Sequence, residues 1–244
     1  MANKKNQKNN KKKKNTSKWV WGIIGVVAFV VFVVLFIIGA TGALMPKGDE
    51  ASSTQTEQGS AQPQQLGENV KTYEVIPEGH PVVTVEMENG KSFKMELYPE
   101  YAPQTVANFV ALAEEGFYDG IGFHRVVEGF MAQGGDPEGT GMGGSESNIV
   151  GEFASNGFVQ NTLSHTRGVV SMARSGHPDS ASSQFFICYD DATFLDGDYA
   201  AFGKVTEGME TVDEFLKIER TANTMGEAAT PVEPIVMKSV TVKR

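Results

Sequence analysis

Apolar and polar residues alternate on both sides of an Asn-Gly pair at residues 89–90. The apolar positions of the two runs are Val83, Val85, Met87, Phe93, Met95 and Leu97. Alternation with period two is typical of a half-buried strand, and Asn-Gly accepts the positive φ angles of a tight turn. The pattern therefore predicts an antiparallel hairpin that opens a folded domain.

A helical period follows the hairpin. After Ala102-Pro103, apolar residues recur at i, i+3, i+4 and i+7, and Gly116 ends the pattern; these residues are Val106, Phe109, Val110 and Ala113. Proline suits the first helical turn and glycine suits the exit, so an amphipathic helix is predicted here. A second amphipathic helix is predicted around Met209, Val212, Phe215 and Leu216.

The other apolar segments are short. They lie at 168–173, 184–189 and 200–205, and a period-two pattern at Val236, Val240 and Val242 closes the chain. Many short strands with only two helices favour a closed or nearly closed antiparallel barrel. We therefore expect a mainly β domain over residues 71–244, with helices covering the ends of the barrel.

The longest apolar run, from Trp19 to about Ile38, follows a lysine-rich tail at residues 1–18. About twenty residues at roughly 1.5 Å each match a hydrocarbon core of about 30 Å. The pattern predicts a transmembrane signal-anchor at 19–45, with the tail cytoplasmic and the domain extracellular or periplasmic. Small residues at 40–43 leave an alternative, in which cleavage of a signal peptide secretes the domain.

Residues 46–70 are rich in Ser, Thr, Gln, Glu, Gly and Pro and nearly free of large apolar side chains. Such a composition cannot bury enough apolar surface to offset the entropy lost on ordering. A disordered linker is therefore predicted between the membrane span and the domain.

Charge is segregated along the chain of 244 residues. The first 45 residues hold eight lysines and no acid, so the remainder carries 13 cations against 30 anions. An acidic domain argues against nucleic acid as a partner. The one cysteine, Cys188, excludes an internal disulfide, and its apolar neighbours predict a buried side chain rather than a reactive thiol.

Familiar catalytic motifs are missing from the sequence. It has no Gly-x-Ser-x-Gly motif, and its four histidines show no metal-binding spacing. The glycine-rich segment 134–144 lacks the lysine of a phosphate-binding loop and carries acids, so it is expected to be a surface loop. We expect neither a metal nor a cofactor.

The densest chemistry lies in the stretch Phe123–Asp136, which combines histidine, arginine, a primary amide and large apolar side chains. Arginine stays charged at any working pH, so it is unsuited to proton transfer. Its guanidinium can instead donate fixed hydrogen bonds beside an apolar pocket.

Five segments together carry a family resemblance: 123–136, 168–174, 183–187, 194–197 and 202–205. In this order they resemble a cyclophilin-type peptidyl-prolyl isomerase, over nearly all of residues 71–244. The resemblance implies an eight-stranded antiparallel barrel closed by two helices, with the active site on an outer face. It implies no metal and no cofactor.

The resemblance also implies roles for individual residues. Arg125, Phe130 and Gln133 would carry catalysis. The substrate-binding residues would be His124, Met131, Ala173, Arg174, Gln184, Phe186, Phe194, Leu195 and Tyr199. The implied substrates are proline-containing polypeptides, and the implied task is to assist the folding of exported proteins. A proline-peptide binding module or chaperone with incidental turnover is the competing interpretation.

Two positions depart from animal members of the family. Phe194 stands where tryptophan is common, and Tyr199 stands where histidine is common. Phenylalanine lacks the indole N–H donor, so reduced affinity for cyclosporin-like cyclic peptides is expected.

Overall fold

The computed structural model describes residues 69–76 and 79–244. The predicted tail (1–18), span (19–45) and all but the end of the linker (46–70) lie outside these residues. Within the described part of the chain, no helix is both long and apolar enough to cross a membrane.

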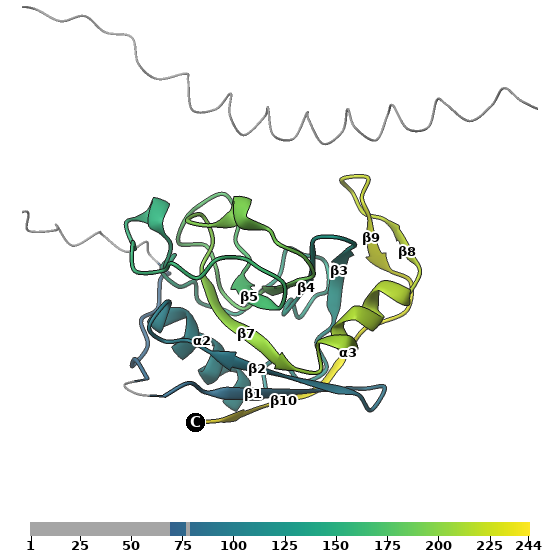
Figure 1. The fold of residues 1–244 in the computed structure, drawn as a ribbon, viewed down its shortest axis with the longest axis horizontal. Helices are drawn as coiled ribbons and strands as arrows, with labels where there is room; N and C mark the ends of the chain where they lie inside the picture. The colour runs from purple at the N-terminus through teal and green to yellow at the C-terminus, as the bar shows by residue number, and fades with distance from the viewer. Residues whose placement is uncertain (1–68, 77–78) are drawn as a thin grey trace, which may run out of the picture. The chain divides into compact units, whose positions relative to one another are not determined.

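Eight antiparallel strands form the main sheet, in the order β10-β1-β2-β7-β5-β6-β4-β3 (Figure 1). The strands are β1 (Val82–Met87), β2 (Ser92–Leu97), β3 (Phe123–Val127), β4 (Met131–Gly134), β5 (Val169–Met172), β6 (Phe185–Cys188), β7 (Ala201–Glu207) and β10 (Met237–Lys243). The number of strands and their antiparallel pairing match the prediction.

The prediction of a closed barrel was wrong. The edge strands β3 and β10 share no ladder; the two edges meet at the single bridge between Gly122 and Val236. Backbone hydrogen bonds support this bridge, including one of 2.8 Å from Phe123 N to Ile235 O. The sheet therefore curls without being closed by a ladder between its two edge strands.

The predicted hairpin is confirmed as β1 and β2, which pair with Val85 opposite Phe93. Its turn is longer than two residues, because Met87 N donates to Lys91 O and Gly90 N donates to Met87 O. Gly90 has φ +81°, a conformation that glycine adopts without steric cost.

The first predicted helix is α2 (Pro103–Glu114), and its apolar stripe is buried in the core. Its N-terminal N–H groups have no local cap. The buried carboxylate of Glu152 accepts hydrogen bonds from Gln104 N and Thr105 N instead, at 2.9 and 2.7 Å. A distant residue thus satisfies donors that a helix start leaves without partners.

The second predicted helix is shorter than expected: α3 (Met209–Asp213) continues as a 3-10 turn, η3 (Glu214–Lys217). Two further 3-10 turns, η1 (Ala154–Asn156) and η2 (Thr193–Leu195), lie in loops. Helix α2 packs against β10, and α3 packs against β2.

Strands β4 and β6 are buried on both faces. In β6, Phe185 and Ile187 belong to the core enclosed by the sheet and helices, whereas Phe186 and Cys188 belong to a second apolar cluster. Alternation along a strand sends neighbouring side chains to opposite faces, so the second cluster lies on the outer face of the sheet. Cys188 is fully buried, as predicted, and burial raises its pKa to about 12.

A two-stranded hairpin of β8 (Arg220–Ala222) and β9 (Ala228–Pro231) was not predicted. Figure 1 shows it in yellow beside β3, which β9 contacts. Its residues are mostly polar or exposed, so no hydrophobic period marks it in the sequence.

Candidate active site

The second apolar cluster, here called the outer cluster, unites side chains from distant parts of the chain. It consists of Met131, Phe186, Cys188, Ala192 and Leu195, with Val127, Phe130, Ala173 and Tyr199 packed against them. Four of the site residues implied by the resemblance, Phe130, Met131, Phe186 and Leu195, therefore lie together in it. The turn that precedes β4 supplies Phe130, and β4, β6 and the turn η2 supply the other three.

Arg125 lies at the edge of the outer cluster. It is the cross-strand neighbour of Gln133 in the β3–β4 ladder, and about a quarter of its side chain (24%) is exposed. Its Cζ atom lies 5.9 Å from the centre of the Phe130 ring, and its Nη1 lies 4.0 Å from Met131 Sδ. A permanent cation is thereby held against an apolar surface.

Three predicted polar residues form a chain of hydrogen bonds. Arg125 Nη1 donates to Gln133 Oε1 at 3.4 Å, and Gln133 Nε2 donates to Gln184 Oε1 at 2.8 Å. Gln184 Nε2 then donates to the backbone oxygen of Gly143 at 2.7 Å. Each amide is oriented by its neighbours, because an amide oxygen only accepts and its nitrogen only donates.

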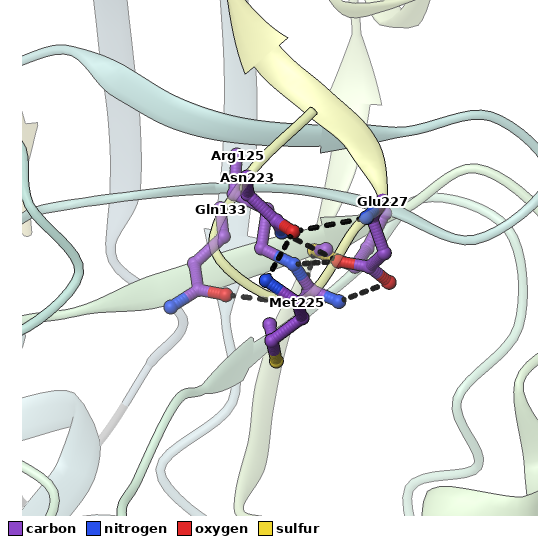
Figure 2. Close-up of polar contacts among 6 residues, drawn as sticks. Arg125, Gln133, Asn223, Met225 and Glu227 are labelled. Carbon is purple, nitrogen blue, oxygen red and sulfur yellow. Dashed lines mark hydrogen bonds and ion pairs between the residues drawn. The ribbon is translucent and has the colours of Figure 1, made fainter. Parts of the chain in front are cut away.

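Glu227 directly precedes β9 in the two-stranded hairpin. It was not predicted as a site residue. Arg125 Nε donates to Glu227 Oε2 and Arg125 Nη2 donates to Glu227 Oε1, both at 2.9 Å (Figure 2). These hydrogen bonds, assisted by one from Asn223, lower the pKa of Glu227 although burial opposes them. The sequence pattern offers no sign of this contact across 102 residues.

The glycine-rich segment is a loop, as predicted, and it is organised around Asp136. This buried carboxylate accepts hydrogen bonds from the backbone N–H groups of Glu138, Thr140 and Gly141, at 2.6–3.0 Å. Burial alone would raise the pKa of Asp136, but the backbone N–H groups of Glu138, Gly141 and Gly143, together with the nearby His124, outweigh burial and lower it. The loop therefore presents the Gly143 oxygen to Gln184 in a fixed position.

His124 lies against this loop. A Cβ atom added to Gly141 would lie 3.6 Å from His124 Nε2. Neither ring nitrogen has a hydrogen-bond partner among the described residues, and burial lowers the pKa of His124, with Asp136 opposing the shift. The lowered pKa favours the neutral form of the His124 ring, which packs against loop 136–144.

The remaining predicted residues border the outer cluster. Phe194 is 70% exposed and its ring lies 5.6 Å from that of Phe130. Tyr199 meets Phe186 edge to face, and the Arg174 guanidinium lies 4.7 Å from the Tyr199 ring. Ala173 N donates to Gln184 O at 2.9 Å, which joins the apolar and polar parts of the site.

A buried polar group that was not predicted supports the cluster from behind. His165 stacks on Phe186, with ring centres 6.0 Å apart. Its Nδ1 lies 2.8 Å from Asp196 Oδ1 and its Nε2 lies 2.9 Å from Ser171 Oγ. Burial lowers the pKa of His165, against the opposing effect of Asp196. These contacts fix the ring that backs the pocket.

The site thus combines an apolar cluster, a fixed cation and oriented amides, which suits binding and polarising a peptide segment. No cluster of three or more His, Cys, Asp or Glu side chains suited to a metal ion occurs within residues 69–76 and 79–244.

Comparison with known proteins supports the family resemblance that was noted in the sequence. The family model of cyclophilin type peptidyl-prolyl cis-trans isomerase/CLD matches residues 82–242. A peptidyl-prolyl cis-trans isomerase of Helicobacter pylori is 45% identical over 150 residues, covering 59% of this chain and 88% of that protein. Peptidyl-prolyl cis-trans isomerase B of Bacillus subtilis is 49% identical over 124 residues, or 51% of this chain and 82% of that protein.

Solved structures agree as well. The crystal structure of a Cryptosporidium parvum cyclophilin type peptidyl-prolyl cis-trans isomerase matches with a TM-score of 0.58 and 31% identity. The match covers 68% of this chain and 99% of that one. The chain belongs to the cyclophilin-type peptidyl-prolyl cis-trans isomerase family, and it is a prolyl isomerase.

Proposed function

We propose that Arg125, Phe130 and Gln133 carry prolyl isomerisation in this chain, with the other predicted site residues lining the peptide groove. The observation that carries the proposal is the position of the Arg125 guanidinium, at the edge of the outer cluster and opposite Gln133. A binding module would need the apolar pocket but not a cation beside it.

The uncatalysed reaction is slow because rotation breaks amide resonance, with a barrier of about 18–20 kcal/mol. In the twisted state the imide nitrogen regains its lone pair and becomes a hydrogen-bond acceptor. A guanidinium donor placed beside it stabilises this state more than either planar isomer, which is the condition for catalysis. No proton changes hands in this step.

The outer cluster has the character of a proline pocket. Its aromatic and aliphatic side chains would hold the pyrrolidine ring while Gln133 holds the flanking peptide, so that rotation is confined to one bond. A further structure of the Cryptosporidium parvum protein was determined in the presence of the dipeptide Ala-Pro. That relative supports proline-containing peptides as substrates here. The side chain of Phe194 lacks the N–H donor that tryptophan would offer, which supports weaker binding of cyclosporin-like peptides.

The role of Arg125 is tested by exchange spectroscopy on an Xaa-Pro peptide with the full-length chain. Arg125→Ala should lower the isomerisation rate at least about a hundredfold, the usual cost of removing one transition-state donor, while peptide affinity changes little. Arg244→Ala is a matched control, because Arg244 also pairs with a glutamate, Glu114, away from the site. Equal rates for Arg125→Ala and the wild-type chain would refute the role.

We further propose that the isomerase domain is tethered outside the cell membrane, where it assists the folding of exported proteins. Support comes from the apolar run within the predicted signal-anchor at 19–45, the lysines before it and the linker composition at 46–70. Secretion after signal cleavage is the competing location.

A further inference from the structure

The contact between Arg125 and Glu227 connects the catalytic candidate to a hairpin outside the main sheet. Both carboxylate oxygens of Glu227 are used, one by Arg125 Nε and one by Arg125 Nη2. A carboxylate bound in this two-bond geometry fixes the guanidinium plane as well as its position.

Geometry, more than the number of donors, shows which nitrogen faces the substrate. Glu227 takes the Nε–H and one of the two Nη2 N–H groups. Both N–H groups of Nη1 remain, and Nη1 lies 3.4 Å from Gln133 Oε1 and 4.0 Å from Met131 Sδ. Met131 belongs to the outer cluster, so Nη1 is the guanidinium nitrogen directed toward the proposed proline pocket. Because both contacts of Nη1 are long, this nitrogen can donate to a bound peptide without losing a strong hydrogen bond.

Glu227 is itself held by the hairpin tip. Asn223 Nδ2 donates to Glu227 Oε2 at 2.9 Å, and Asn223 Oδ1 accepts from the backbone N–H groups of Met225 and Glu227 (Figure 2). Asn223 N also donates to Glu227 O at 2.8 Å. One asparagine therefore fixes both the backbone and the carboxylate of the residue that faces Arg125.

We infer that Glu227 is a positioning residue for isomerisation: it orients the Arg125 guanidinium so that Nη1 faces the imide nitrogen of a bound proline. The inference rests on the proposed role of Arg125. An unrestrained arginine side chain samples many rotamers, and a misplacement of about 1 Å at a catalytic group can cost a hundredfold in rate.

The first test compares turnover in full-length variants, again on an Xaa-Pro peptide. Glu227→Ala should lower kcat by about tenfold to a hundredfold with KM nearly unchanged. Glu227→Gln keeps the size of the side chain and one acceptor oxygen, so its rate should lie between those of Glu227→Ala and the wild-type chain. Glu114→Ala, which removes the carboxylate of the remote Arg244 pair, should turn over at the wild-type rate.

The second test observes the guanidinium directly. In ¹H–¹⁵N spectra, the Nε–Hε signal of Arg125 is identified by its loss in Arg125→Ala. It should report a restrained group in the wild-type chain and a mobile one in Glu227→Ala. Asn223→Ala retains the carboxylate but removes its support, so it should give intermediate mobility and an intermediate rate, even if Glu227→Ala proves too unstable to assay.

The outcomes separate the two proposals. Wild-type kcat in Glu227→Ala and Asn223→Ala, together with a large loss in Arg125→Ala, overturns the positioning role and leaves the proposed function standing. Wild-type kcat in Arg125→Ala overturns the proposed role of Arg125 and the positioning role with it.

Discussion

The sequence shows the chemistry of each side chain in this protein, but it seldom shows which other residue that side chain contacts. Arg125 and Gln133 are eight residues apart, and a short hairpin makes them cross-strand neighbours, so their meeting follows from local structure. Glu227 is separated from Arg125 by most of the domain, and a lone glutamate between glycine and alanine carries no distinguishing pattern. Only folding brings the two charges together.

Asp136 provides a prediction about pH at this scale. Its pKa is lowered in the folded chain, so its contribution to stability is complete above the unfolded pKa of about 3.9 and disappears as pH falls through the lower folded value. Asp136→Asn should therefore reduce the free energy of unfolding by about 2 kcal/mol at pH 7, since hydrogen bonds to a charged group are lost.

Urea unfolding at pH 7 and at pH 3 checks this expectation. The difference between Asp136→Asn and the wild-type chain should shrink at pH 3, because this pH lies below the unfolded pKa of about 3.9, where the contribution of the carboxylate to stability has begun to decline. A difference that is equal at both pH values would contradict the assigned role of the charge in ordering loop 136–144.

At the level of elements, the spacing of hydrophobic residues predicted the strands and the helix that have one buried face. The period-two runs became β1 and β2, and the period of 3.6 became α2. Strand β6 is apolar at every position because it is buried on both faces, so its sequence alone does not assign Phe186 to the site and Phe185 to the core. The β8–β9 hairpin lacks any apolar period and escaped prediction.

Gly203 tests the close contact between β2 and β7. A Cβ atom added there would lie 2.6 Å from Glu96 O, a backbone atom that cannot move alone. Gly203→Ala should lower the free energy of unfolding by about 1–3 kcal/mol, as overpacking generally does. The measurement is chemical denaturation.

Gly176→Ala is the matched control, because an added Cβ there meets nothing within 4 Å. This variant should stay within about 0.5 kcal/mol of the wild-type chain, as exposed substitutions usually do. Equal stability of the two variants would show that β2 and β7 can separate slightly without cost.

For the whole molecule, the proposed membrane tether makes a prediction about location. The full-length chain should sediment with membranes, resist extraction at alkaline pH and retain its N-terminus, because an apolar run of about twenty residues inserts stably. Fractionation with N-terminal mass spectrometry is the measurement. Deleting residues 19–45 should move the protein to the soluble fraction, and mature protein beginning near Leu44 would establish the secreted alternative instead.

The amino-acid sequence by itself determined the antiparallel character of the domain and its first hairpin and helix. These features depend on local period, which is a property of short segments. The residues expected in the site followed from the resemblance of several short motifs to one family, which the sequence also carries. Tertiary structure alone decided that the sheet stays open between β3 and β10, that Glu152 caps α2 and that Glu227 holds Arg125. Each of these depends on contacts between residues far apart in the chain, whose meeting is set by the packing of the whole domain.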